Sequence, residues 1–275
     1  MTHTRSVCSL WIEEDDVQLD TTNILGVLVN ACNPHNTISQ VNFWIEKTAR
    51  SYICVTGVHG IMECQRSETV RAAHNSAGLV VPDGMPLVYI SRLAGRRNTC
   101  RVYGPDLLLK LCKESLTQGY KHYFFGTTPA TLSKLTEHLI RDFPGLKIVG
   151  TYAPPFRPLT PDETAQIISH INECGPDIVW VGLSTPKQEL WMAQNREALN
   201  APVLIGVGAA FDFHAGSVPQ APRWIQPLCL EWLFRLIAEP RRLWKRYLIN
   251  NPQFLALAAL QGLGLNKYKG YTRQS

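Results

Sequence analysis

Residues 178–207 read IVWVGLSTPKQELWMAQNREALNAPVLIGV. Two short apolar runs in this stretch, Ile178–Val181 and Val203–Val207, have the length and the β-branched content of buried strands. Between them, a polar loop with one glycine leads into a segment with helical patterning, Glu189–Ala198. A strand, a helix and a second strand in this order predict two parallel strands joined by a helical crossover.

The same alternation continues along most of the 275 residues. Apolar runs predict five further strands, at Ile24–Val29, Tyr52–Val55, Leu79–Val81, His122–Phe125 and Lys147–Val149. Periodic segments predict five further helices, at Ile38–Ala49, Glu68–Asn75, Leu107–Leu116, Ala130–Asp142 and Pro161–Glu173. Thr37 and Gln40 predict a capping box for the first of these helices, and Thr160 before Pro161 predicts the N-cap of the last. The sequence therefore predicts an α/β fold, with a mostly parallel sheet covered by helices on both faces and the strand order left open.

Composition excludes several classes of protein. Hydrophobic residues make up 45% and charged residues 18% of the chain, which excludes an intrinsically disordered protein. The eight cysteines form no C-x-x-C pair and no zinc-like pair with histidine, so we expect reduced, mostly buried thiols in a cytosol. No apolar stretch is long enough to predict a membrane span or a signal peptide.

The positive charge is concentrated at the end of the chain. The net charge is +5, and residues 223–275 contain nine Lys or Arg against two acidic residues. We therefore expect two parts, an α/β catalytic domain at residues 1–222 and a basic, amphipathic helical appendage at residues 223–275. A basic segment of this kind favours an anionic partner, either nucleic acid or a membrane surface, although a solvated basic face is the simpler alternative.

Glycine-containing polar loops follow most of the predicted strands. Because ligands of open parallel sheets bind beyond the carboxyl ends of the strands, these loops predict a pocket for a nucleotide or a nucleotide sugar. The run Gly206-Val207-Gly208 begins like a dinucleotide fingerprint, but Phe211 stands where its last glycine would be. Phosphate-loop, nucleophile-elbow and Asp-x-Asp motifs are also absent, so we expect arginine, lysine and backbone donors, and no metal, to bind phosphate.

Several sequence motifs, most of them in these loops, are similar to those of a known family. They are V-P-D-G-M-P-L-V at 81–88, R-V-Y-G-P-D-L at 101–107, G-L-S-T-P-K-Q-E-L-W at 182–191, G-V-G-A-A-F-D at 206–212, A-P-R-W at 221–224, L-E-W-L-F-R-L at 230–236 and E-P-R-R at 239–242. In this order they resemble the WecG/TagA/CpsF family of bacterial glycosyltransferases over about residues 24 to 250. The resemblance implies a Rossmann-like fold and transfer of a sugar, with inversion and without metal or cofactor, from a UDP-sugar to a polyprenyl-diphosphate-linked sugar.

The resemblance also implies roles for individual residues. The family's catalytic base falls on Asp83 and its active-site threonine on Thr56. His59 stands in a loop where many members have Thr-Pro-Asn, and we expect it to fill part of the place of that asparagine in the active site. Substrate contacts are implied for Arg101 and Gln188. Diphosphate contacts are implied, more loosely, for arginines of the appendage: Arg223, Arg235, Arg241, Arg242 and Arg246. The missing asparagine leaves the donor sugar open.

Each of these residues has a simpler structural alternative. Asp83 could cap the helix that follows it, and Arg101 could pair with Asp106 or another acidic residue. Gln188 could be a helix-start residue, and His59 a local hydrogen-bonding group. Asp212, next to a glycine turn, could bind the nucleotide or cap a helix. Thr127 and Thr128, which follow Gly126, could bind diphosphate oxygens or form a plain turn.

The appendage combines tryptophans, a tyrosine and arginines in a pattern typical of an interfacial membrane anchor. If one helix continued, Arg235, Arg242 and Arg246 would share a face, but Pro240 predicts a break and a second helix. We therefore expect a cytoplasmic enzyme of cell-envelope glycan synthesis, attached peripherally to the anionic inner face of the cell membrane and possible as a homo-oligomer. The alternatives are a nucleotide-sugar epimerase or dehydrogenase and, less favoured by the acidic first 222 residues, a nucleic-acid-binding protein.

Overall fold

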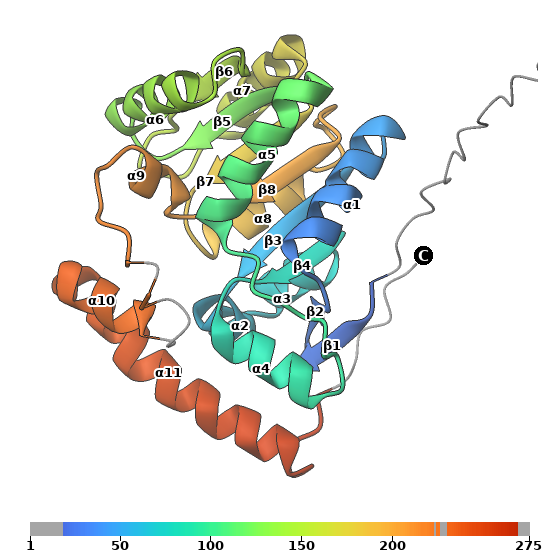
Figure 1. Ribbon diagram of the computed structural model, residues 1–275, viewed down its shortest axis with the longest axis vertical. Coiled ribbons are helices and arrows are strands. Elements are labelled where there is room, and N and C mark those ends of the chain that lie inside the picture. Colours follow the sequence, from blue (N-terminus) through green and yellow to red (C-terminus); the bar gives the residue numbers. More distant parts are fainter. Residues whose placement is uncertain (1–18, 223, 226–229, 269–275) are drawn as a thin grey trace, which may run out of the picture.

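The computed structural model describes residues 19–222, 224–225 and 230–268. Its main element is a six-stranded parallel sheet with the order β4-β3-β8-β7-β5-β6 (Figure 1). The strands of this sheet are β3 (Ser51–Thr56), β4 (Leu79–Pro82), β5 (Lys121–Gly126), β6 (Lys147–Tyr152), β7 (Ile178–Gly182) and β8 (Val203–Gly206). The predicted α/β class, with a mostly parallel sheet, is confirmed.

Helices cover both faces of the sheet, and alternate strand residues supply the two cores. Tyr123 and Phe125 of β5 point into one apolar cluster and Phe124 into the other. The first cluster is closed by α2 (Val58–Arg66), α3 (Glu68–Asn75), α4 (Met85–Leu93), α7 (Pro161–Cys174) and α8 (Lys187–Asn195). The second is closed by α1 (Pro34–Glu46), α5 (Gly104–Gln118), α6 (Pro129–Asp142) and α9 (Ala210–His214).

The first predicted strand, Ile24–Val29, is wrong. The segment forms an antiparallel hairpin of β1 (Thr21–Ile24) and β2 (Val27–Asn30), separate from the main sheet. Leu25 and Gly26 both have positive φ angles, 50° and 83°, as the tight turns of two-residue hairpins require. The apolar run therefore reverses direction where the sequence pattern predicts a continuous strand.

The predicted capping box of Thr37 and Gln40 is also wrong. Helix α1 begins four residues earlier than predicted, because Asn33 and Asn36 form the capping box and Pro34 occupies the first turn. Thr37 instead donates its hydroxyl hydrogen to the carbonyl oxygen of Asn33 at 2.8 Å. The predicted N-cap of α7, Thr160, is confirmed, with Glu163 completing a capping box.

The end of the chain forms two helices, α10 (Glu231–Ala238) and α11 (Pro240–Gly262), which lie below the sheet in Figure 1. The predicted break before Pro240 is confirmed. One face of α11 packs on the body, where Phe254 is buried in the first apolar cluster. Further along, the Gln261 side chain accepts a hydrogen bond from the Leu25 amide and donates one to the Asn23 carbonyl, so α11 is fastened to the β1–β2 hairpin.

Candidate active site

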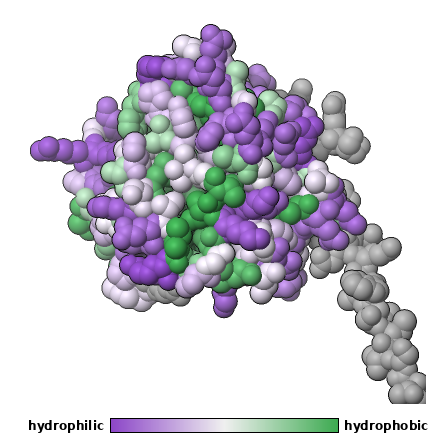
Figure 2. Space-filling model, turned by 90° about the horizontal axis from the view of Figure 1, so that it is seen from above, coloured by the Kyte–Doolittle hydropathy of each residue, from purple (hydrophilic) through white to green (hydrophobic). Residues whose placement is uncertain are grey.

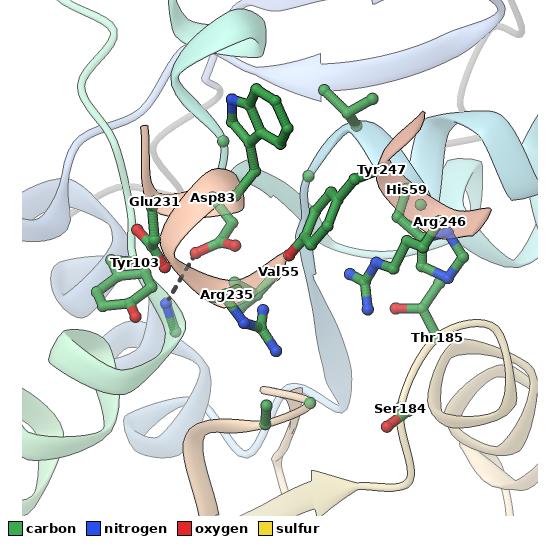
Figure 3. A pocket seen from close by; sticks show the side chains of 18 of the residues that line it. Val55, His59, Asp83, Tyr103, Ser184, Thr185, Glu231, Arg235, Arg246 and Tyr247 are labelled. Atoms are coloured by element: carbon green, nitrogen blue, oxygen red, sulfur yellow. Dashed lines mark hydrogen bonds between the residues drawn. The ribbon is translucent and has the colours of Figure 1, made fainter. Parts of the chain in front are cut away.

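A cavity of about 350 Å³ opens at the carboxyl ends of β3, β4, β7 and β8, where parallel sheets bind their ligands. Helices α10 and α11 form the opposite wall, so residues far apart in the sequence meet across it (Figure 3). The polar side chains that line it are His59, Asp83, Arg101, Tyr103, Ser184, Thr185, Gln188, Glu231, Arg235, Arg242, Arg246, Tyr247 and Asn251.

Asp83 follows β4 and is held by backbone groups on two sides. Its amide donates to the Thr56 carbonyl at 2.9 Å, and its Oδ1 accepts a hydrogen bond from the Gly104 amide, the first residue of α5, at 3.2 Å. The carboxylate therefore binds the start of α5, whereas α4, the helix that follows it, has no side-chain cap. The second oxygen, Oδ2, faces the cavity beside Gly57, so the aspartate combines a helix contact with an accessible carboxylate oxygen.

Arg101 joins Asp83 to α10. It donates from Nε to the Asp83 carbonyl and from Nη2 to Glu231 at 2.7 Å, and its guanidinium lies 4.0 Å from the centre of the Tyr103 ring. Burial by itself would lower the pKa of Arg101, but the charges of Asp83 and Glu231 raise it overall. Of the two predictions for Arg101, a substrate contact or an ion pair with an acidic residue, the structure shows the ion pair, and its partner is Glu231.

Three arginines form the basic side of the cavity. Arg235 comes from α10, and Arg242 and Arg246 come from α11, so the break at Pro240 does not separate them. Within the described residues, the Nε atoms of Arg235 and Arg246 are buried without a hydrogen-bond partner. Burial lowers the pKa of Arg246, and the neighbouring guanidinium groups of Arg235 and Arg242 lower it further. Arg242 donates from Nη2 to Glu239, so it is Arg235 and Arg246 that offer unsatisfied donors, which suit an anion with several oxygens, such as a diphosphate.

The position of Arg223, another predicted site residue, lies outside the described residues. Arg241 is exposed on α11 and is not among the residues that line the cavity.

His59 lines the cavity as a neutral ring held between two elements. Its Nδ1 lies 3.1 Å from Nδ2 of Asn250 on α11, whose Oδ1 accepts a hydrogen bond from Arg66. The amide therefore donates to Nδ1, and the remaining ring nitrogen is left to donate to the backbone of Thr185. Burial, with the charges of Arg246 and Arg66, lowers the pKa of His59 to about 3. His59 thus links α11 to the loop after β7.

Gln188 lines the floor of the cavity, but its amide is engaged within the protein. Its Oε1 accepts from the Gly208 amide at 3.0 Å, and its Nε2 donates to Glu189 at 2.9 Å. The side chain therefore fastens the turn after β8 to the start of α8, and only 1% of Gln188 is exposed.

The remaining predicted residues are not part of the cavity lining. Thr56 is buried and bonds the Cys54 carbonyl, so its backbone rather than its side chain supports Asp83. Thr128 caps α6. Thr127 donates to Asp212 at 3.4 Å, and burial raises the pKa of Asp212 although Thr127 and the nearby Arg242 oppose the shift.

The sequence interpretation missed several residues that the structure places in or beside the site, among them Tyr103, Glu231, Tyr247 and Asn250. Tyr103 and Glu231 lie inside motifs that carry the family resemblance, which was a usable signal. No sequence signal pointed to Asn250, because its contact with His59 depends on the position of α11. No group of three or more acidic, histidine or cysteine residues suited to a metal ion occurs in the part of the chain that the structure describes.

Comparisons with known proteins show which family the chain is similar to. Residues 22–268 match the family described as glycosyl transferase WecG/TagA/CpsF. Among curated proteins, the chain is 28% identical over 205 residues to an N-acetylglucosaminyldiphosphoundecaprenol N-acetyl-beta-D-mannosaminyltransferase of Bacillus spizizenii, covering 74% of this chain and 77% of that protein. It is 32% identical over 174 residues to a protein of the same description from Bacillus subtilis, covering 63% of this chain and 66% of the relative.

Proposed function

Because the chain belongs to the glycosyl transferase WecG/TagA/CpsF family and is therefore a glycosyltransferase, we propose that it transfers a sugar from a UDP-sugar to a polyprenyl-diphosphate-linked sugar. The relatives act, by their names, on an undecaprenyl-diphosphate-linked N-acetylglucosamine, which supports a lipid-linked acceptor. Family membership favours this function over the epimerase, dehydrogenase and nucleic-acid-binding alternatives. The observation that carries the proposal is the position of the Asp83 carboxylate across one cavity from three arginines.

The proposed chemistry is a single displacement. The acceptor hydroxyl oxygen attacks the anomeric carbon, the bond from that carbon to the UDP oxygen breaks, and the electron pair leaves with UDP. The hydroxyl proton passes to Oδ2 of Asp83, which faces the cavity. Arg235, Arg242 and Arg246 stabilise the charge that develops on the diphosphate. One displacement inverts the anomeric configuration.

A transfer assay tests the function directly. A panel of UDP-sugars is incubated with a short-chain polyprenyl-diphosphate N-acetylglucosamine, and the product and its anomeric configuration are determined. We expect transfer of one sugar with inversion, and the same rate in excess EDTA because arginines supply the positive charge. Absence of transfer from every UDP-sugar would contradict the proposal, and a strict need for a divalent ion would contradict the role of the arginines.

We further propose that the outer face of α10 and α11 docks on the anionic inner leaflet of the membrane. Exposed apolar residues of α11 lie on one side of the helix at Trp244 and Leu248, with Arg241 and Lys245 beside them. Ile237 of α10 is 73% exposed. None of the described helices is both long and apolar enough to cross a bilayer. The division into a catalytic domain, 1–222, and an appendage, 223–275, belongs to this proposal.

The double variant Ile237→Glu and Leu248→Glu tests the docking face. We expect it to lose most of its binding to vesicles that contain phosphatidylglycerol, because two charges replace apolar contact area, while UDP binding is retained. The matched control is Leu116→Glu with Ile140→Glu, two exposed apolar residues of α5 and α6. Figure 2 shows the end of the molecule opposite α10 and α11, where a central apolar area and several smaller ones lie among hydrophilic side chains. Equal loss in both double variants would contradict the assignment of the docking face.

A further inference from the structure

The cavity has two electrically different ends. Asp83 and Glu231 stand at one end, Arg246 stands at the other, and Arg235 lies between them (Figure 3). Arg101 lies against the two carboxylates, and Arg242 is a further basic residue of the lining. The side chains of Arg101 and Glu231 are only 16% and 15% exposed. Charges interact strongly at such a partly buried position. The charge at each end of the cavity therefore decides which part of a substrate that end binds.

The acidic end is unsuited to a phosphate. Arg101 directs Nε to the Asp83 carbonyl and Nη2 to Glu231, and the two carboxylates outweigh its single positive charge. A diphosphate brought here would face a net negative charge. An uncharged hydroxyl group meets no such repulsion, so this end fits the attacking sugar, and the diphosphate of the donor fits the basic end.

Arg101 forms a close ion pair with Glu231 and a more distant one with Asp83. Nη2 of Arg101 lies 2.7 Å from Glu231 Oε2 but 4.0 Å from Asp83 Oδ1, which is too long for a hydrogen bond. Arg101 therefore contacts the backbone of Asp83 directly and leaves its carboxylate to the Gly104 amide.

We propose that Glu231 is a positioning residue for Asp83, which acts by holding Arg101 away from the Asp83 carboxylate. The inference rests on the proposed function, in which Asp83 is the base. Without the Glu231 charge, Nη2 is free to turn to Oδ1 and form a direct ion pair. A carboxylate paired in this way is a weaker proton acceptor and is drawn away from the incoming hydroxyl.

The test compares three variants by steady-state kinetics and by calorimetric titration with UDP. For Glu231→Gln we expect a kcat about 10–100-fold lower, with the acceptor KM and the UDP affinity within about 3-fold of the parent. Glu231→Asp, which keeps the charge, is expected to recover most of the lost kcat. Glu197→Gln is the matched control, since Glu197 forms an exposed ion pair with Arg50 far from the cavity. Thermal unfolding of each variant checks that the fold is retained.

Three results would overturn the inference. A kcat of Glu231→Gln equal to that of the parent would mean that Glu231 only anchors α10. A UDP affinity that falls as much as kcat would place Glu231 in the donor site. If Glu231→Asp lost as much kcat as Glu231→Gln, the negative charge at this position would not be what positions Asp83. A parent protein that transfers no sugar would overturn the proposed function and this inference together, whereas an active parent isolates the inference.

Discussion

Asp83→Asn is expected to lower kcat by about 10²–10⁴-fold, the range that a general base contributes. This corresponds to about 3–5 kcal/mol of transition-state stabilisation. Asparagine keeps an oxygen that can accept the Gly104 amide hydrogen at the position of Oδ1, so the start of α5 retains its partner. It cannot take a proton from the acceptor hydroxyl. UDP binding, measured by calorimetry, is therefore expected to change by less than about 3-fold.

The control for this variant is Asp106→Asn, which removes a carboxylate from the first turn of the same helix without touching the main cavity. It is expected to keep the parent kcat. If Asp83→Asn retained a kcat within about 3-fold of the parent, proton transfer would have to be assigned to another group.

Arg246→Met is expected to weaken UDP binding by about 10–100-fold while raising the midpoint of thermal unfolding. Binding falls because a hydrogen bond to a charged group contributes about 1.5–3 kcal/mol. Stability rises because Arg246 is a positive group whose Nε is buried without a partner, near the like charges of Arg235 and Arg242. Methionine fills much of the same space without that charge. Opposite changes in binding and stability would identify a site built for a ligand.

Arg97→Met serves as the control, since Arg97 is exposed and its loss changes the net charge equally. Neither UDP affinity nor the unfolding midpoint is expected to move with Arg97→Met. A lower unfolding midpoint for Arg246→Met, without loss of UDP affinity, would assign Arg246 a purely structural role.

The fold was predictable to the extent that it depends on local pattern. The runs that became β5, β7 and β8 are apolar on both faces, as the central strands of a covered sheet must be. The hairpin at Leu25 and Gly26 was not predicted, because a non-glycine residue with a positive φ leaves no clear sequence signal.

The site was predictable only in part, because strand order decides which loops meet. The loops after β3, β4 and β8 belong to adjacent strands and line the cavity together. The loop after β5, with Thr127 and Thr128, belongs to a strand separated from β8 by β7, and it does not reach the lining. Glu231 and Asn250 depend in turn on the way α10 and α11 return to the body, which no local pattern encodes.

Helix α11 is fastened to the rest of the protein at Asn250 and again at Gln261, about 16 Å apart along its axis. One side of this helix carries guanidinium groups into the cavity, and the other presents apolar side chains outward. A displacement of α11 therefore moves the guanidinium groups and the exposed apolar side chains together. By thermodynamic reciprocity, if attachment to a bilayer strengthens the hold on UDP by some factor, UDP strengthens attachment to the bilayer by the same factor.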